Sequence, residues 1–213
     1  MLKYIPASTE VSRIALTRKG FFCSIEKIMR ITGGTGKGRK LRVPAGSRVR
    51  PTSDKVKQAL FNILGGQVRD AAFLDLFSGT GGIGIEALSR GAKQVFFVDD
   101  SRDSLQATRH NLEQAGFESE AKVVASRAES FLKKTEEQFD IIFLDPPYSL
   151  EQQPLLECVS ESRVIRPDSI VVYEHFKKEQ SPQTAGRLVL DREAVYGDTV
   201  LAFYRMNEVR YRD

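Results

Sequence analysis

One stretch, residues 73–84, most restricts what this chain can fold into. Its first half is apolar except for Asp75, as expected of a strand that is buried on both faces. Glycines follow at positions 79, 81, 82 and 84, and an apolar helical pattern resumes at Ile85. A strand, a glycine turn and a helix in this order let backbone lie against a ligand with no Cβ atoms between them. The stretch therefore predicts a nucleoside-cofactor site in an α/β fold.

The glycine spacing alone fits more than one cofactor. Gly79-x-Gly81-x-x-Gly84 satisfies the dinucleotide fingerprint. Asp75, four residues before Gly79, also gives the Asp-x-x-x-Gly-x-Gly spacing that resembles class I S-adenosylmethionine methyltransferases, where the acid lies near the cationic methionyl part. A dinucleotide would instead place its pyrophosphate at the helix N-terminus, where an extra carboxylate would repel it. A glycine-rich turn without any ligand is the remaining alternative.

Strand patterns alternate with helical patterns along the chain, which predicts a mostly parallel sheet with helices on both faces. Ligands bind such sheets at the carboxyl ends of the strands. Asp99 ends one strand pattern 20 residues after Gly79, where a carboxylate can meet ribose hydroxyls. Alternatively, Asp99 or Asp100 only caps the next helix. Strands are expected near residues 73–77, 94–100, 121–124, 139–144, 169–174, 186–195 and 199–205, and helices near 53–64, 82–90, 102–115, 129–134 and 151–161.

The tetrapeptide Asp145-Pro146-Pro147-Tyr148 directly follows an apolar strand pattern. Two consecutive prolines remove two N–H donors and fix φ, so the chain must leave the sheet as a stiff turn. Such a turn can hold the Asp145 carboxylate and the Pro146 carbonyl as two acceptors for the two hydrogens of an exocyclic amine. The Tyr148 ring beside them can stack on a flipped-out base. The tetrapeptide thus points to methyl transfer onto a base amine, and an ordinary Asp-Pro turn is the alternative.

Positive charge is concentrated in residues 30–57, which carry nine basic residues and one acid, whereas the whole chain has a net charge of only +4. Residues 30–50 alternate basic with small or apolar types around glycines, which predicts a short hairpin. A basic ribbon can lie along a phosphate backbone. The lack of interleaved acids favours nucleic acid over an ordinary solvated charge run. One of residues 52–54 can then cap a helix that ends at Gly65.

Two cysteines, Cys23 and Cys158, form no CxxC pair, so we expect neither a metal site nor a disulfide framework. No apolar run approaches the ~20 residues needed to cross a bilayer. Basic residues also interrupt the N-terminal stretch that would form the apolar part of a signal peptide. We therefore expect a cytoplasmic, monomeric protein without a membrane partner.

Several spaced segments together resemble the bacterial family that methylates guanine N2 in 16S ribosomal RNA. The resemblance covers about residues 29–206. It implies a Rossmann-like class I methyltransferase with a seven-stranded sheet, which binds S-adenosylmethionine and releases S-adenosylhomocysteine. It also implies that 16S rRNA or a small ribosomal subunit assembly particle is the substrate. The matching segments are 29–31, 38–41, 50–52, 59–64, 73–81, 145–148, 174–175 and 196–199.

The resemblance, together with the charge pattern, assigns a role to each candidate residue. The guanine amine would meet Asp145, Pro146, Pro147 and Tyr148. The cofactor would be lined by Asp75, Phe77, Ser78, Gly79, Thr80, Gly81, Asp99 (ribose), Arg127 and Ala128 (adenine, through the Ala128 backbone). RNA would be contacted by Arg30, Lys37, Arg39, Lys40, Arg42, Arg48, Arg50 and Thr52. The expected division is an N-terminal extension (1–28), a basic hairpin (29–50), a methyltransferase domain (51–206) and a C-terminal tail (207–213).

Three positions depart from the family pattern. Asp99 stands where the family usually has glutamate, which shortens the reach to the ribose. Arg127 replaces an acid, so only a backbone contact to adenine is expected there. Gln58 stands where Glu is common, which weakens any electrostatic role at that position. Three other functions stay open: a DNA adenine-N6 methyltransferase, an NAD-dependent oxidoreductase, and an RNA-binding protein without catalytic activity.

Overall fold

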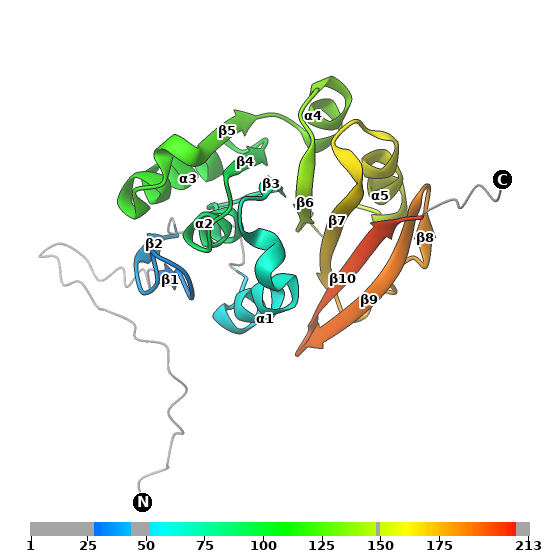
Figure 1. The fold of residues 1–213 in the computed structure, drawn as a ribbon, viewed down its shortest axis with the longest axis horizontal. Coiled ribbons are helices and arrows are strands. Elements are labelled where there is room, and N and C mark those ends of the chain that lie inside the picture. The colour runs from blue at the N-terminus through cyan, green and yellow to red at the C-terminus, as the bar shows by residue number, and fades with distance from the viewer. Residues whose placement is uncertain (1–27, 44–51, 148–149, 208–213) are drawn as a thin grey trace, which may run out of the picture.

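The computed structural model describes residues 28–43, 52–147 and 150–207. One large sheet dominates the described chain, and a separate two-stranded hairpin precedes it (Figure 1). The hairpin strands are β1 (Ile28–Arg30) and β2 (Lys40–Arg42). In spatial order the strands of the large sheet are β5 (Ala121–Ala125), β4 (Gln94–Asp99), β3 (Ala72–Leu76), β6 (Phe139–Leu144), β7 (Ile165–Phe176), β10 (Thr199–Met206), β9 (Leu188–Tyr196) and β8 (Thr184–Ala185).

The sheet is parallel from β5 to β7 and antiparallel from β7 to β8. The predicted fold class is therefore confirmed, and each of the seven predicted strands is present. An eighth strand, β8, was not predicted, because two residues, Thr184 and Ala185, are too few to show an alternating pattern. The predicted turn at Gly197-Asp198 joins β9 to β10.

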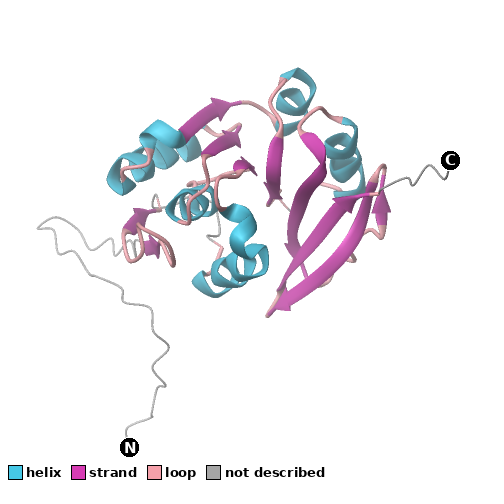
Figure 2. Cartoon of the chain, viewed as in Figure 1, coloured by secondary structure: helices cyan, strands magenta, loops and turns pink. Residues whose placement is uncertain are grey.

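Helices cover both faces of the sheet (Figure 2). The hairpin and the first three helices share one apolar core with one face, and the last two helices share a second core with the other face. Five helices match predicted helices. They are α1 (Asp54–Leu64), α2 (Gly82–Ser89), α3 (Arg102–Ala115), α4 (Ala128–Lys134) and α5 (Gln152–Glu161), and two 3₁₀ turns, η1 (Gly65–Val68) and η2 (Glu118–Glu120), connect elements between them.

The hairpin presents one apolar and one basic side. Met29 pairs with Leu41 in the ladder, and both side chains are buried in the core shared with α1, α2 and α3. Arg30 and Lys40, the next pair, are exposed. This alternation confirms the predicted hairpin as far as β2. Residues 44–50 of the predicted ribbon lie outside the described residues.

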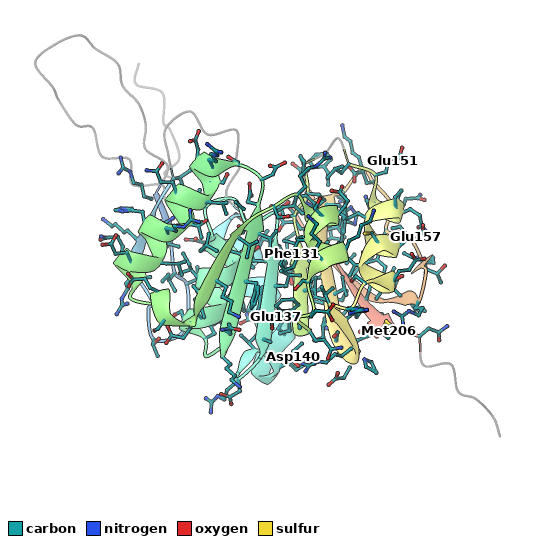
Figure 3. All side chains as sticks on the ribbon, turned by 90° about the horizontal axis from the view of Figure 1, so that it is seen from above. Phe131, Glu137, Asp140, Glu151, Glu157 and Met206 are labelled. Atoms are coloured by element: carbon teal, nitrogen blue, oxygen red, sulfur yellow. The ribbon has the colours of Figure 1, made fainter. Side chains whose placement is uncertain are left out.

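The two edges of the sheet carry different polar groups. At the amino edge, Asp140 accepts a hydrogen bond from the Ala72 N–H at 2.7 Å and pairs with Arg166, which ties β3, β6 and β7 together. Glu151, in the segment after β6, lies at the opposite edge (Figure 3). That carboxyl edge holds the glycine stretch, Asp99 and Asp145. No helix among the described residues is long and apolar enough to cross a bilayer.

Candidate active site

The glycine stretch forms a tight loop at the carboxyl end of β3. Phe77 has a φ of +68°, a left-handed conformation that is uncommon for a residue with a Cβ atom. This turn lets the Phe77 and Ser78 N–H groups both donate to the Val98 carbonyl, at 2.9 and 3.1 Å. Gly81 is also left-handed, and a Cβ atom there would lie 2.9 Å from the Thr108 Cγ2 atom. The loop therefore requires glycine at position 81, as the spacing predicted.

Two carboxylates hold the loop from the strand ends. Asp99 Oδ2 accepts from the Gly79 N–H at 2.8 Å, and Asp75 Oδ2 accepts from the Gly84 N–H at 2.9 Å. Asp99 Oδ1 also accepts from the Ser101 N–H at 2.9 Å, at the start of α3. The N-cap of α3 is Ser101, and not Asp99 or Asp100 as the alternative to the ribose role had it. Asp99 contributes to the start of the helix only through its bond to the Ser101 N–H. The ribose role of Asp99 stays a prediction.

The same bonds bear on the cofactor class. A dinucleotide fingerprint works by offering free N–H groups to a pyrophosphate. Here the Gly79 and Gly84 N–H groups are already bonded to carboxylates, and the Gly81 N–H donates to the Ser78 carbonyl at 2.8 Å. A pyrophosphate would find these donors taken and two acids beside it. The geometry therefore disfavours the dinucleotide alternative.

Three acids are close enough at this edge to influence one another. Asp75 is only 2% exposed, and burial raises its pKa to about 7, with the Asp145 and Asp99 charges adding to the rise against the Gly84 hydrogen bond. Burial also raises the pKa of Asp145 to about 7. The pKa of Asp99 is raised by burial too, opposed by its backbone hydrogen bonds. A cationic ligand among these acids would restore their ionised forms.

A pocket adjoins the proline-rich turn. The turn contributes Asp145, Pro146 and Pro147, whereas Tyr148 lies outside the described residues. The other wall comes from the carboxyl end of β7 and from the strand beside it. Its lining residues are Leu150, Tyr173, Glu174, His175, Phe176, Glu179 and Thr199. Asp145 thus lines this pocket and is also close enough to Asp75, which holds the glycine loop, for its charge to raise the pKa of Asp75.

Glu174 and His175 were left without a role by the sequence, and the structure places both on this pocket. His175 is 6% exposed, with Nδ1 3.0 Å from the Phe176 carbonyl and Nε2 2.8 Å from the Ser181 hydroxyl, which also donates to Glu193. These bonds fix the shape of the pocket wall. The sequence did contain a signal for this placement. Both residues lie at the carboxyl end of a buried strand, and ligands bind at such ends, which is the argument that selected Asp99.

The segment after β5 reaches the site through backbone. The Ser126 N–H donates to the Asp99 carbonyl at 3.0 Å, which places Arg127 and Ala128 beside β4. The Arg127 side chain is 75% exposed and lies 4.0 Å from Glu129, whereas Ala128 is buried at the start of α4. This placement leaves backbone rather than the Arg127 side chain next to the loop. The adenine contact itself stays a prediction.

The predicted RNA-binding residues divide into two groups. Lys37, Lys40 and Arg42 are exposed on the hairpin, and Thr52 is half-buried before α1. Arg30 and Arg39 are also exposed but have partners inside the protein. Arg30 pairs with Asp54 at 2.7 Å, while Arg39 donates to the Ala115 carbonyl and lies over the Phe117 ring. Arg48 and Arg50 lie outside the described residues.

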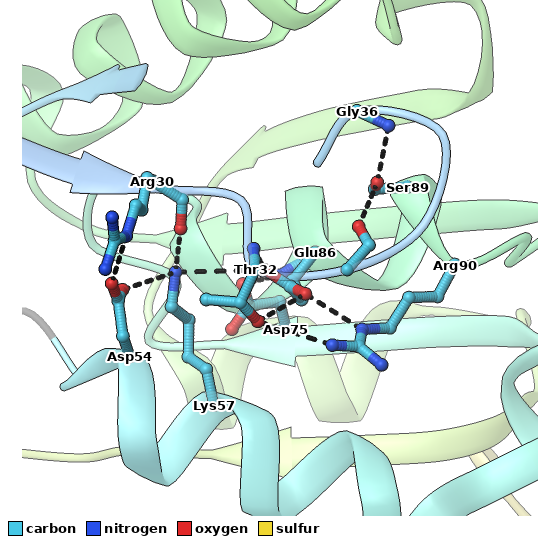
Figure 4. A network of polar contacts seen from close by, with 11 residues as sticks. Arg30, Thr32, Gly36, Asp54, Lys57, Asp75, Glu86, Ser89 and Arg90 are labelled. Atoms are coloured by element: carbon cyan, nitrogen blue, oxygen red, sulfur yellow. Dashed lines mark hydrogen bonds and ion pairs between the residues drawn. The ribbon is translucent and has the colours of Figure 1, made fainter. Parts of the chain in front are cut away.

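A buried polar network lies beneath the hairpin and was not predicted from the sequence (Figure 4). Glu86, on α2 and fully buried, accepts from the Thr32 N–H at 2.7 Å, from its hydroxyl at 2.8 Å and from Arg90 at 2.8 Å. Lys57, one of the nine basic residues of the 30–57 stretch, is fully buried and donates to the Arg30 carbonyl. Burial lowers the pKa of Lys57, opposed by Glu86 and Asp54. Lys57 is therefore a structural cation and is not available to RNA.

Within the described ranges no group of three or more His, Cys, Asp or Glu side chains has the arrangement of a metal site.

Known proteins resemble this chain in sequence over most of its length. The family described as "Conserved hypothetical protein 95" matches residues 29–205. The chain is 40% identical over 181 residues to "Putative rRNA methyltransferase YlbH" of Bacillus subtilis, which covers 83% of this chain and 98% of that protein. It is 34% identical over 183 residues to "Ribosomal RNA small subunit methyltransferase D" of Escherichia coli, which covers 83% of this chain and 89% of that protein.

A solved structure shares the fold. It is an RNA methyltransferase from Salinibacter ruber in complex with S-adenosyl-L-homocysteine, with a TM-score of 0.60, 22% identity, and coverage of 77% of this chain and 98% of that chain. The predicted Rossmann-like architecture is therefore confirmed. The predicted family is confirmed as well, since the match spans the hairpin, the glycine loop and the proline-rich turn. The chain belongs to the "Conserved hypothetical protein 95" family, and rRNA methyltransferases are among its relatives.

Proposed function

We propose that this protein transfers a methyl group from S-adenosylmethionine to the exocyclic N2 amine of a guanine in 16S rRNA. One observation carries the proposal. The half-buried Asp145 carboxylate directly follows β6, which lies beside β3, and β3 carries Asp75 and leads into the glycine loop, so the proposed partner of the amine and the proposed cofactor loop lie at the same end of the sheet. The rRNA methyltransferases among the relatives support rRNA as the substrate.

The loop residues fit S-adenosylmethionine. Asp75 is a buried acid, and burial raises its pKa to about 7. A methionyl moiety carries two cationic groups, the ammonium and the sulfonium, which would favour the ionised form of this acid. The Ser78 hydroxyl is buried and has no hydrogen-bond partner among the described residues, which leaves it free for a ligand. Phe77, Gly79, Thr80 and Gly81 would line the same cofactor, Asp99 would accept from the ribose, and backbone at Arg127 and Ala128 would meet the adenine. When bound, the cofactor supplies a methyl group on a positively charged sulfur.

The proline-rich turn would orient the amine. The lone pair of an exocyclic amine is delocalised into the base, so the nitrogen is a poor nucleophile. Acceptance of its two hydrogens by the Asp145 carboxylate and the Pro146 carbonyl favours a pyramidal nitrogen whose lone pair is free to attack. Pro147 keeps the turn rigid, and stacking on Tyr148 would add ~1–3 kcal/mol to hold the flipped base. Asp145, with a pKa of about 7, can also take the proton that the nitrogen loses.

The hairpin would bind the RNA backbone. Lys37, Lys40 and Arg42 present exposed charge on an element that is fixed to the core. Arg30, Arg39 and Thr52 would contribute as well, and we retain Arg48 and Arg50, which lie outside the described residues, as proposed RNA contacts. We propose that the substrate is 16S rRNA, free or in a small-subunit assembly particle, that the protein acts as a monomer in the cytoplasm, and that residues 29–50 and 51–206 are the RNA-binding and catalytic parts.

The test is methyl transfer by the purified protein with methyl-labelled S-adenosylmethionine. The substrates are deproteinised 16S rRNA, small-subunit assembly particles and duplex DNA, and the modified nucleoside is identified by mass spectrometry. We expect N2-methylguanosine from one or both RNA substrates. Label in N6-methyladenosine of DNA would favour the DNA methyltransferase. Binding of RNA without any transfer, or binding of NAD in place of S-adenosylmethionine, would overturn the proposal.

A further inference from the structure

One buried amide connects the hairpin to the glycine loop. Asn111, on α3, is fully buried. Its Oδ1 atom accepts from the Arg42 N–H at 2.7 Å, and its Nδ2 atom donates to the Arg42 carbonyl at 3.0 Å. The second Nδ2 hydrogen goes to the Thr80 carbonyl, also at 3.0 Å. The side chain thus holds both backbone groups of an exposed basic residue and one backbone group of the loop.

Only an amide can make these three bonds. They require two donors and one acceptor on one planar group, which Asn provides. Asp would direct a carboxylate oxygen at two carbonyl oxygens, and Ala would leave the Thr80 carbonyl and the Arg42 backbone groups without this partner. A buried polar group without a hydrogen-bond partner destabilises the folded state. The position is therefore built for this connection.

Two neighbouring contacts strengthen the connection. Thr108, one turn earlier on α3 and also fully buried, donates its hydroxyl to the Gly79 carbonyl at 2.9 Å. Met29, on the other strand of the hairpin, packs so closely on the start of α2 that a Cβ atom at Gly82 would lie 2.5 Å from its sulfur. Thr108 and Asn111 therefore hold the Gly79 and Thr80 carbonyls toward α3. Because both peptides are trans, the N–H groups of Thr80 and Gly81 point away from these carbonyls. The hairpin and the loop form one contact unit.

We infer that Asn111 is a positioning residue that couples RNA binding at the hairpin to cofactor binding at the glycine loop. The inference rests on the proposed function. A phosphate bound by the exposed Arg42 side chain immobilises a backbone segment that Asn111 already ties to Thr80. A cofactor bound against the loop immobilises the same unit from the other end. Each ligand then binds a unit that the other has already ordered, so each tightens the other by the same factor.

The test compares the dissociation constant of S-adenosylhomocysteine with and without RNA. The RNA probe is a short oligouridylate at low salt, and both ligands are used with the full-length protein in calorimetry. We expect RNA to tighten S-adenosylhomocysteine binding about fivefold or more in the wild type. In Asn111→Ala the ratio of the two dissociation constants, without RNA and with RNA, should fall to one. Leu105→Ala, which removes a buried apolar side chain from the same helix, is the control for lost stability, and it should keep the wild-type ratio.

A ratio of one in the wild type, or an unchanged ratio in Asn111→Ala, would overturn the inference. If Asn111→Ala does not fold, hydrogen exchange on the wild type decides. S-adenosylhomocysteine should then slow hydrogen exchange of the Arg42 amide. An exchange rate that is the same with and without the ligand would overturn the coupling. A wild-type protein that binds no S-adenosylhomocysteine would overturn the proposed function first, whereas independent binding of both ligands would overturn this inference alone.

Discussion

The two halves of the carboxyl edge are built on different principles. Around β3 and β4 a glycine-rich backbone loop forms the site, and the neighbouring side chains of Asp75, Asp99 and Asn111 hold that backbone. Around β6 and β7 a pocket lies beside the proline-rich turn, and Asp145 on that turn is one of its lining residues. Under the proposed function, the first half (the cofactor half) would bind S-adenosylmethionine. The second half (the amine half) would admit and release an RNA.

This difference decides what a substitution should do. A change in the cofactor half should alter affinity and stability, because the loop itself depends on the side chain. A change at the turn should alter the rate of transfer and leave the cofactor half intact. Substitutions in the two halves should therefore be separable by measuring affinity, stability and rate on the same variants.

The largest effect is expected at Asp145. Asp145→Ala removes the acceptor that orients the amine, and a misplaced nucleophile costs about 100-fold in rate or more. S-adenosylhomocysteine binding, measured by calorimetry, should change little, because the loop keeps its own hydrogen bonds. Rate is measured as methyl transfer to rRNA under single-turnover conditions.

Asp145→Asn is the matched variant. It keeps a carbonyl oxygen of the same reach but cannot take a proton at neutral pH. Recovery of most of the rate would mean that Asp145 acts by orientation, and a rate as low as that of Asp145→Ala would mean that proton acceptance dominates. Wild-type rates in Asp145→Ala would contradict the division into two halves.

A smaller effect, on affinity, is expected at Asp75. Asp75→Ala removes the carboxylate proposed to meet the cationic part of the cofactor, and it leaves the Gly84 N–H without its acceptor. Hydrogen bonds to charged groups contribute about 1.5–3 kcal/mol, so the dissociation constant of S-adenosylmethionine should rise about 10- to 100-fold. Asp75→Asn keeps an acceptor for Gly84 and separates loop support from charge. Unchanged affinity in both variants would place the cofactor elsewhere.

The sequence predicted the cofactor half better than the amine half, for a physical reason. Left-handed turns and close backbone approach demand glycine, so the backbone geometry at Gly79 and Gly81 is visible as spacing. The side chains that hold this backbone are not, because Asn111 and Thr108 read as ordinary helical residues until α3 is placed against the loop. The pocket wall at His175 was likewise hidden, since its neighbours Ser181 and Glu193 come from separate segments. Lys57 was counted with the basic residues that could bind nucleic acid, although it is buried and paired with Glu86. A count of basic residues in a sequence cannot distinguish an exposed lysine from a buried, paired one.

The pH dependence of stability gives a third, moderate effect. The folded protein keeps the Asp75 proton up to about pH 7, whereas the unfolded chain loses it near the ordinary value of 3.8. Between these values the unfolded state binds fewer protons, so the free energy of unfolding should fall as the pH rises and level off above 7. The slope attributable to Asp75 is roughly 1 kcal/mol per pH unit. Chemical denaturation of the wild type and Asp75→Asn checks this, and equal slopes in the two proteins would contradict it.

A fourth, smaller effect is expected on the hairpin. Lys40→Gln with Arg42→Gln removes two exposed charges while the backbone bonds to Asn111 remain. RNA affinity should fall, and the log–log salt slope should flatten by about 0.7–0.9 for each phosphate that the hairpin no longer neutralises. Arg39 is a poorer choice, because its change also removes the hydrogen bond to Ala115. Lys133→Gln with Lys134→Gln, at the exposed end of α4, is the control of equal charge. An equal loss in both double variants would mean that binding follows net charge alone.

The smallest expected effect comes from the N-terminal extension. The sequence assigns residues 1–28 to an extension outside the two proposed functional parts, and a deletion should end at residue 27, because Ile28 pairs with Arg42 in the hairpin ladder. Removal of residues 1–27 should leave methyl transfer and S-adenosylhomocysteine affinity unchanged. Removal of residues 1–31 also takes Met29 from its packing on Gly82, so it should weaken cofactor binding although it deletes no proposed cofactor residue. If the shorter deletion abolishes activity, the extension takes part in catalysis. If the longer one spares cofactor affinity, the hairpin does not support the loop.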